Sequence, residues 1–388
     1  MVALEDFVDT FFNSISDLHS VRKSLDKEYA AGLVEILKRA SKDISDHTGK
    51  LLHKLHEKKP DEDTLQAMIS ASPSSLSYKD EHGNLPIHAA TVDLDSVRYV
   101  PLLAKEGVKY NVGGEDGRGG LLVQDEDDEN ALERLGSNRQ GGNDDKHRYD
   151  ERCVDVMKEL REANLFTKKD VEDYDLLHHT CFAETEGYML RFVYLSDWCP
   201  EGLKKHRFDN LPLIHAIIEF NDDIGAFATF LKAATKHHMN EACLLFQYDD
   251  DGVTACERAF EKFGKGASIR VIGDCIPFDE PQIPILHHVA KHAPQLLNDF
   301  SARYISAVYS RDDNGRNLNQ TLLASGKTTF KDDCMYFVRL SDDQVREIDP
   351  VTDLYPFMVA ASSGISDLSA VYMLLRRNPS LVRSGIKH

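Results

Sequence analysis

The amino-acid sequence predicts an all-α protein organised as a helical-repeat solenoid, with short hairpin turns and a helical cap at its N-terminus. Three observations lead to this prediction. Apolar residues recur at helical spacing near the N-terminus, a turn-and-helix motif occurs twice with closely matching residues, and fainter copies of that motif follow at spacings of about 29 to 43 residues.

Composition and charge exclude several classes of protein. The chain has 388 residues, of which 41% are hydrophobic, so it can bury a sizeable core. Its formal net charge of −19 disfavours binding to nucleic-acid phosphates and favours a partner with a basic surface. Seven cysteines without a Cys-x-x-Cys pair predict reduced thiols. With no expected signal peptide or transmembrane segment, we expect an intracellular protein of the cytoplasm or nucleus.

Residues 1–59 are expected to form the helical cap. A first stripe of apolar residues recurs with helical period, at Leu4, Phe7, Val8, Phe11, Phe12, Ile15 and Leu18. A second stripe lies between Leu33 and Ile44. The alternative, a helix lying on a membrane surface, is less favoured because the polar face of the first stripe is acidic and anionic lipid would repel it.

Residues 111–150 differ in composition from the rest. They contain eight glycines and eleven acidic residues against five Lys or Arg. Such a segment has little apolar surface to offset its ordering entropy, so it is predicted to be a disordered insertion with a short helical stretch near Asn130–Leu135. A solvated spacer is favoured over an acidic recognition segment.

Internal repetition is the most informative feature. Residues 72–91 and 199–218 share Pro-x-x-Leu, then Asn-Leu-Pro, then His-Ala at nearly the same offsets. Aligning the fainter copies on the proline predicts that the first helix of each unit begins near positions 86, 176, 212, 255, 284, 318 and 356. Residues 60–110 would form the first unit and residues 151–388 the remainder.

The motif resembles the ankyrin repeat, whose consensus is Gly-x-Thr-Pro-Leu-His-x-Ala, over roughly residues 64–384. It looks most similar to the divergent ankyrin-like proteins abundant in diatoms and related algae, in which Leu-Pro often replaces Thr-Pro. The resemblance implies a non-enzymatic scaffold or adaptor that binds another protein along a concave face and its hairpin tips. A structural subunit of a larger complex is the alternative.

The repeated residue types have physical reasons. Glycine permits the positive φ of a tight turn, proline suits the first turn of a helix, and a Thr and a Glu three residues apart form a capping box. The structural repeat positions are Gly83, Pro86, His88, Pro212, His215, Gly252, Thr254, Glu257, His287, Gly315 and Pro356.

His88 could be a catalytic imidazole or a structural one. The resemblance implies a structural histidine that ties neighbouring turns by hydrogen bonds, although Leu85 replaces the usual threonine. We favour the structural interpretation because the histidine recurs at repeat spacing, whereas a catalytic group would occur once.

An enzyme is the third possibility. His288 and His292 are four residues apart and would share a helix face, as in the zinc-binding His-Glu-x-x-His motif, but the glutamate and a third ligand are missing. No catalytic residue, metal or cofactor is therefore predicted.

The partner is expected to meet acidic hairpin tips. The resemblance places the ligand on the tips and the first helices, and a Lys/Arg-rich segment would suit their charge. The candidate partner-binding residues are Asp80, Glu81, His82, Asp209, Asn210, Asp249, Asp250, Asp251, Asp312 and Asp313.

Overall fold

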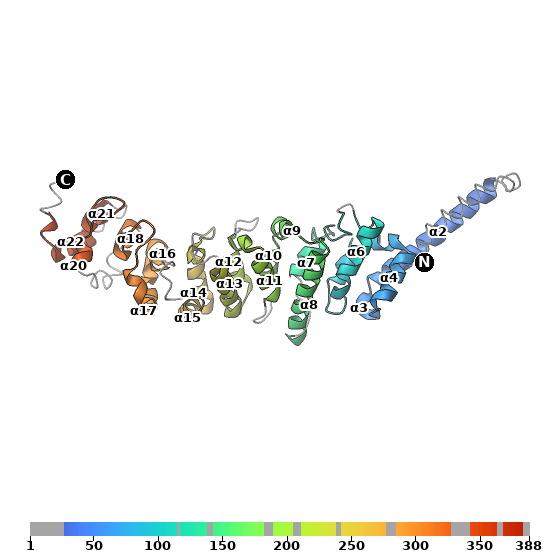
Figure 1. Ribbon diagram of the computed structural model, residues 1–388, viewed down its shortest axis with the longest axis horizontal. Coiled ribbons are helices and arrows are strands. Elements are labelled where there is room, and N and C mark those ends of the chain that lie inside the picture. Colours follow the sequence, from blue (N-terminus) through green and yellow to red (C-terminus); the bar gives the residue numbers. More distant parts are fainter. Residues whose placement is uncertain are drawn as a thin grey trace. The chain divides into compact units, whose positions relative to one another are not determined.

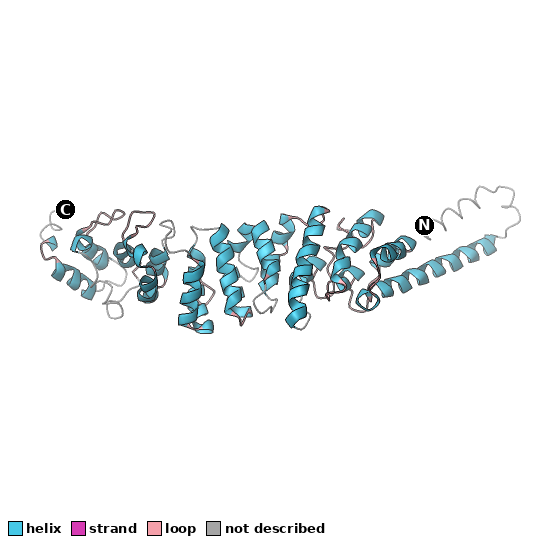
Figure 2. Cartoon of the chain, turned by 60° about the horizontal axis from the view of Figure 1, so that its bottom comes forward, coloured by secondary structure: helices cyan, strands magenta, loops and turns pink. Residues whose placement is uncertain are grey.

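The computed structural model describes residues 27–114, 117–137, 143–181, 189–204, 211–237, 242–276, 285–326, 342–362 and 368–382. The chain divides into two compact units, Met1–Gly202 and Leu203–His388. Helices make up the regular structure of the described residues in both units (Figures 1 and 2). The predicted all-α class is confirmed.

The described residues of the first unit form α-helices with short 3-10 helices between some of them. They are α2 (Lys27–Leu52), α3 (Leu55–Lys58), α4 (Glu62–Ala71), η1 (Pro73–Ser77), α5 (Pro86–Ala90), η2 (Val97–Tyr99), α6 (Val100–Tyr110), α7 (Ala131–Ser137), α8 (Asn143–Glu162), α9 (Lys168–Asp173), α10 (Leu176–Cys181) and α11 (Leu190–Trp198). The 3-10 helix η3 (Pro200–Lys204) crosses the boundary.

The second unit continues with helices of similar length. They are α12 (Leu213–Phe220), α13 (Ile224–His237), η4 (Ala242–Phe246), α14 (Ala255–Phe263), α15 (Lys265–Cys275), α16 (Ile285–His292), η5 (Pro294–Leu296), α17 (Leu297–Arg303), η6 (Ile305–Tyr309), α18 (Leu318–Ala324), α20 (Asp342–Arg346), α21 (Pro356–Ser362) and α22 (Leu368–Arg377).

Helix starts follow the sequence pattern closely. A helix begins at, or one residue after, each of the seven aligned positions. The expected capping box at α14 is present, since Thr254 N–H donates to Glu257 Oε2 at 3.0 Å and Glu257 N–H donates to Thr254 Oγ1 at 3.3 Å. Pro86 is the first residue of α5, whereas Pro212 lies one residue before α12 as its N-cap.

A tight turn built on one aspartate precedes several of these helices. Asp80 Oδ1 accepts the N–H groups of His82 and Asn84, each at 2.9 Å. Asp249 and Asp312 hold their turns in the same way. The residue three positions later has positive φ, 69° at Gly83, 72° at Gly252 and 80° at Gly315, which explains the recurring glycine.

The prediction of a disordered insertion at 111–150 is wrong for the described residues of that range. Asp125 forms the same turn, accepting the N–H groups of Asp127 and Glu129, and Asp128 takes the positive-φ position at 60°. The helix α7 follows. Apolar side chains of this segment are fully buried, namely Leu121, Ala131, Leu132 and Leu135.

This segment therefore shows the same turn-and-helix pattern as the other helix starts. Pro86, Ala131 and Leu176 begin α5, α7 and α10, which makes two equal steps of 45 residues where the sequence alignment had one long gap. The pattern was not recognised in the sequence here, because aspartate replaces the turn glycine and alanine replaces the proline. Four of its apolar residues, Leu121, Ala131, Leu132 and Leu135, are fully buried, so the average composition underestimated the apolar surface that the segment buries.

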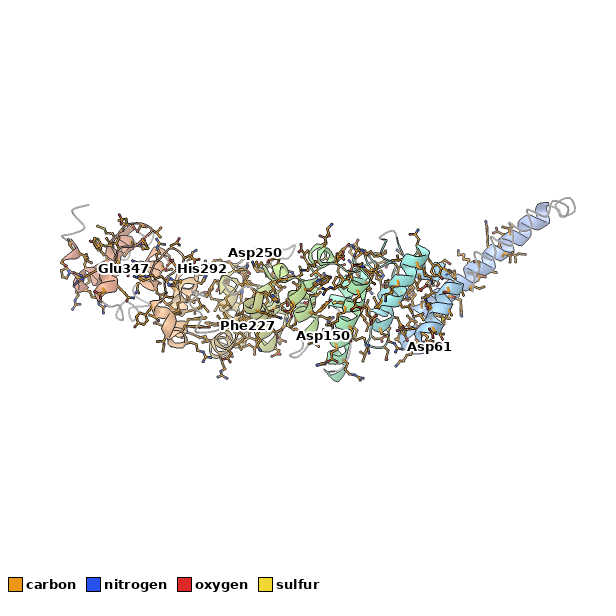
Figure 3. The ribbon with its side chains drawn as sticks, in the orientation of Figure 1. Asp61, Asp150, Phe227, Asp250, His292 and Glu347 are labelled. Carbon is orange, nitrogen blue, oxygen red and sulfur yellow. The ribbon has the colours of Figure 1, made fainter. Side chains whose placement is uncertain are left out.

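Within each unit, helices two or three positions apart in the chain pack against each other. In the first unit α7 packs against α10, and α8 packs against α11 (Figure 1). In the second, α12 packs against α14, α13 against α15, α16 against α18, and α18 against α21. Phe227, labelled in Figure 3, is fully buried and stacks on Phe263 with ring centroids 6.2 Å apart.

The N-terminal region is described from residue 27 onward. The first apolar stripe, 4–18, lies outside the described residues. The helix α2 contacts η1, while Ile36 and Ile44 on it are 64% and 44% exposed. Across the part of the chain that the structure describes, no helix is both long and apolar enough to cross a membrane.

Candidate functional site

The repeat histidine of the first unit links two turns. His88 is fully buried, and its Nδ1 accepts the N–H of Leu85, the N-cap residue of α5, at 3.0 Å. Its Nε2 lies 2.8 Å from the carbonyl oxygen of Val123, which precedes the turn at Asp125 in the same unit. Because an N–H can only donate and a carbonyl can only accept, the ring is neutral with its proton on Nε2.

The same link recurs in the second unit. His215 Nε2 lies 2.9 Å from Gln247 O, and His287 Nε2 lies 3.1 Å from Ser310 O. Gln320 takes this role in α18 and donates from Nε2 to Glu347 O at 3.1 Å. Each accepting carbonyl, including that of Val123, stands two residues before a turn aspartate, at Asp125, Asp249, Asp312 or Asp349.

These contacts explain the chemistry of the histidines. Burial lowers the pKa of His88, His215 and His287 below their ordinary value. At His88 and His287 both ring nitrogens have hydrogen-bond partners, since His287 Nδ1 lies 2.8 Å from Thr321 Oγ1. At His88 the lone pair of Nδ1 is occupied by the Leu85 N–H, while at His287 the Thr321 hydroxyl lies near both Nδ1 and Asp312 Oδ2.

The candidate partner-binding residues fall into two groups. Asp80, Asp249 and Asp312 hold their turns with one carboxylate oxygen. Their neighbours are exposed, namely Glu81, His82, Asp250, Asp251 and Asp313. Asp209 and Asn210 lie outside the described residues.

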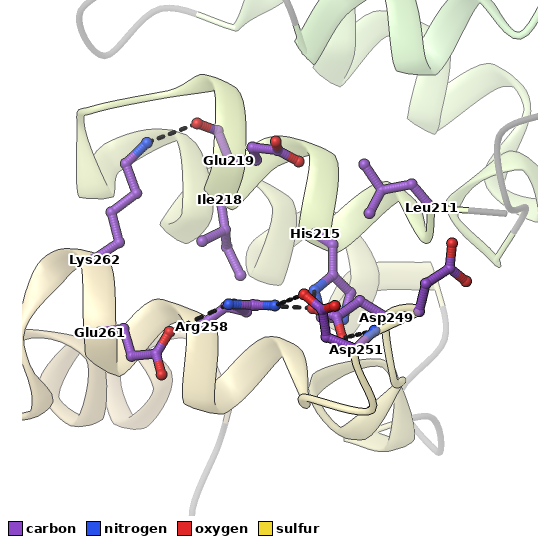
Figure 4. Close-up of a pocket in the computed structure, with 10 residues that line it drawn as sticks. Leu211, His215, Ile218, Glu219, Asp249, Asp251, Arg258, Glu261 and Lys262 are labelled. Atoms are coloured by element: carbon purple, nitrogen blue, oxygen red, sulfur yellow. Dashed lines mark hydrogen bonds and ion pairs between the residues drawn. The ribbon is translucent and has the colours of Figure 1, made fainter. Parts of the chain in front are cut away.

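The structure brings Asp249, Asp250 and Asp251 together in a groove of the second unit, which we call the α12–α14 groove (Figure 4). Its cavity measures about 650 Å³. The walls are α12 on one side and the 249–252 turn with α14 on the other. The lining residues are Leu211, His215, Ile218, Glu219, Asp249, Asp250, Asp251, Arg258, Glu261 and Lys262.

Two cations in the α12–α14 groove are already paired. Arg258 bonds to Asp249 at 2.8 Å and to Asp251 at 2.6 Å. Lys262 donates to Glu219 O at 2.8 Å and lies 3.1 Å from Asp222. Burial raises the pKa of Asp249, but the hydrogen bonds from Val253 N–H and Arg258 outweigh burial, so its pKa is lowered and the carboxylate stays ionised at neutral pH.

Two carboxylates of the groove remain available. Glu219 and Asp250 are exposed, and within the described residues no hydrogen bond or ion pair engages either carboxylate. Asp250 is labelled in Figure 3. Five carboxylates line the groove against Arg258 and Lys262, so its charge is net negative.

Sequence reasoning missed the α12 and α14 side chains of this groove. A usable signal existed, because Arg258 follows Asp249 by nine residues and Arg134 follows Asp125 by nine, and both pairs form ion pairs. Asp249, predicted as a partner-binding residue, holds its turn and bonds to Arg258.

A smaller cavity of about 360 Å³ occupies the corresponding place between α16 and α18. It is lined by Asp312 and by cationic side chains, including Lys291 and Arg316. Arg316 is held by Asp349 at 2.8 Å. The two cavities lie beside corresponding helix pairs, α12 with α14 and α16 with α18, but differ in the charge of their lining residues.

The pair considered for zinc has an aromatic environment. The rings of His288 and His292 stack with centroids 6.2 Å apart, and each also stacks on Phe246. His292 Nδ1 lies 3.3 Å from Tyr248 Oη. The described residues contain no group of three His, Cys, Asp or Glu side chains placed to hold a metal ion.

Comparison with known proteins leaves the chain without an assigned family. No model of a known protein family matches it, and no curated protein matches it. The resemblance to ankyrin repeats therefore depends on the motif residues alone.

Proposed function

We propose that the repeat units stack as an ankyrin-like solenoid whose role is to bind another protein without catalysis. The support is the recurring link between units. A buried His or Gln of one unit reaches the carbonyl before the aspartate turn of the next, at His88, His215, His287 and Gln320. Such nearest-neighbour contacts are what hold a stacked array together.

The α12–α14 groove is the proposed binding site, and its partner is a Lys/Arg-rich segment. The single observation that carries this proposal is a cavity of about 650 Å³ in which no described residue pairs with the carboxylates of Glu219 and Asp250, which lie beside apolar Leu211 and Ile218. Exposed ion pairs contribute only about 0 to 1 kcal/mol each, so the apolar residues must supply part of the affinity.

The test is a charge substitution that leaves the turn intact. Glu219→Gln combined with Asp250→Asn removes two carboxylates without touching Asp249, which holds the turn and Arg258. Association with the partner recovered by pull-down from cell extract, or with a Lys/Arg-rich peptide, should slow for this variant and also slow at high salt for the parent.

The matched control is Asp43→Asn with Glu159→Gln, which removes the same charge from exposed positions of α2 and α8. If the association rate does not change with salt and is equal in both double variants, the proposal of a basic partner is refuted. A structural subunit remains the alternative role, and a stable native complex of fixed mass that withstands high salt would favour it.

A further inference from the structure

His215 differs from the other repeat histidines in one hydrogen bond. Its Nε2 contacts Gln247 O at 2.9 Å like the others, and its side chain is only 3% exposed. The residue lines the α12–α14 groove (Figure 4), and its Nδ1 lies 3.8 Å from Asp249 Oδ2. The described residues place no hydrogen-bond donor on this Nδ1.

Two sequence changes remove the usual donors. The N-cap of α5 is Leu85, whose N–H occupies Nδ1 of His88, whereas the N-cap of α12 is Pro212, which has no N–H. His287 Nδ1 is instead met by Thr321, four residues after the N-cap of α18.

The residue equivalent to Thr321 beside His215 is Arg258, four residues after the N-cap of α14. Its guanidinium bonds to Asp249, Asp251 and Glu261. Neither of the two usual donors is therefore available to His215.

The protonation state of His215 follows from its one partner. Gln247 O only accepts, so Nε2 carries the proton and Nδ1 presents a lone pair to the groove. Asp249 Oδ2 accepts one bond, from Arg258 Nε at 2.8 Å, and has capacity for another. Two acceptors thus face the same cavity, beside the exposed carboxylates of Glu219 and Asp250.

We propose that His215 Nδ1 and Asp249 Oδ2 together accept the N–H groups of one Lys or Arg side chain from an extended segment of the partner. This proposal rests on the proposed function and adds the atoms that receive the cation. Glu219 and Asp250 supply charge, while His215 supplies direction, because a lone pair in a fixed buried ring accepts only along its plane.

The test uses Pro212→Leu, which restores the cap N–H present at Leu85. The probe is a fluorescently labelled nine-residue peptide of alternating Arg and Gly with blocked termini, and parallel arms replace Arg by Lys or by uncharged citrulline. Affinity for the Arg and Lys peptides should fall about tenfold in Pro212→Leu, because its N–H now occupies Nδ1. The citrulline peptide should bind the parent more weakly than either.

The control is His215→Gln, because glutamine fills this role at position 320. Its Nε2–H can still reach Gln247 O, and its Oε1 replaces Nδ1 as acceptor, so affinity should change less than about threefold. Thermal melts of both variants check folding. The ¹⁵N resonance of His215 Nδ1 in the parent, assigned by its loss in His215→Gln, should move when peptide is added.

The outcomes separate the two proposals. In one outcome, peptide binding weakens with salt and in the Glu219→Gln, Asp250→Asn variant, but Pro212→Leu does not change it and the Nδ1 resonance does not move. That outcome overturns the role of His215 and keeps the proposed function. If neither the Arg peptide nor the Lys peptide binds the parent protein, both the role of His215 and the proposed function are refuted.

Discussion

At the scale of single residues, one position does two tasks. The third residue of α5 and of α18 offers an acceptor to the N-cap N–H and a donor to a carbonyl that precedes an aspartate turn. His88 and Gln320 do both. Glu257 can only accept, so it caps Thr254 and receives Gln295 from the following unit at 2.6 Å. The position thus tolerates His, Gln or Glu for a physical reason.

His88→Ala should lower the free energy of unfolding of the first unit by about 1 to 3 kcal/mol, because Leu85 N–H and Val123 O both lose a buried partner. His88→Gln should cost less, since glutamine can donate and accept at the same place. Thermal and chemical denaturation of the two variants measure the difference. Equal losses would show that the hydrogen bonds are not what His88 contributes.

At the scale of elements, a buried ion pair joins three helices of the first unit. Arg191 on α11 and Asp150 on α8 are each 2% exposed in their side chains and lie 2.5 Å apart. Arg191 Nη1 also donates to Leu135 O and Gly136 O at the end of α7, while Asp150 accepts Leu190 N–H at the start of α11. Figure 3 labels Asp150.

Asp150→Asn should therefore destabilise the first unit by about 3 to 5 kcal/mol, because it leaves a buried guanidinium without its counter-charge. Urea denaturation gives the free energy of unfolding directly. Asp155→Asn, an exposed site on the same helix, is the control and should change it by less than about 0.5 kcal/mol.

Mutation of a buried residue tests whether the segment around α7 contributes to the core. Leu132 is fully buried, and Leu132→Ala should cost about 2 to 5 kcal/mol through lost burial and the cavity left behind. Leu368, which is 80% exposed on α22, gives the same chemical change without burial. If both variants unfold like the parent, the 117–137 segment contributes no core.

At the scale of the whole chain, buried imidazoles in both units respond to acid together. Burial lowers the pKa of His88, His215 and His287 from 6.5, so the unfolded chain binds more protons than the folded one just below that pH. Their contribution to stability is complete above about pH 6.5 and is lost as pH falls toward the folded pKa values.

The free energy of unfolding should consequently fall between pH 7.5 and pH 5.5. Replacing the three histidines by glutamine should flatten that dependence, because glutamine makes the same bonds and does not titrate. Denaturation at both pH values, for the parent and the triple variant, checks this. An undiminished slope in the triple variant would assign the acid sensitivity to other groups.

The sequence by itself determined the all-α class, the helix starts and the turn chemistry. These are local: an aspartate, a residue with positive φ three positions on, and a helix-compatible cap act within about six residues, so Gly83, Pro86, Thr254 and Glu257 could be placed from the printed letters. The helix at Ala131 was itself predicted, as a short helical stretch near Asn130–Leu135. Its turn-and-helix pattern was not recognised, because Asp128 and Ala131 stand where glycine and proline stand elsewhere.

Tertiary structure alone decided which polar groups meet between helices that are far apart in the sequence. Val123 O and Gln247 O reach their histidines, and the groove around Glu219 forms, only when one helical segment packs against the next within each unit. The lack of a donor on His215 Nδ1 depends on both the sequence and the tertiary structure. The proline is visible in the sequence, but the missing donor at Arg258 depends on a fold that turns that guanidinium toward Asp249.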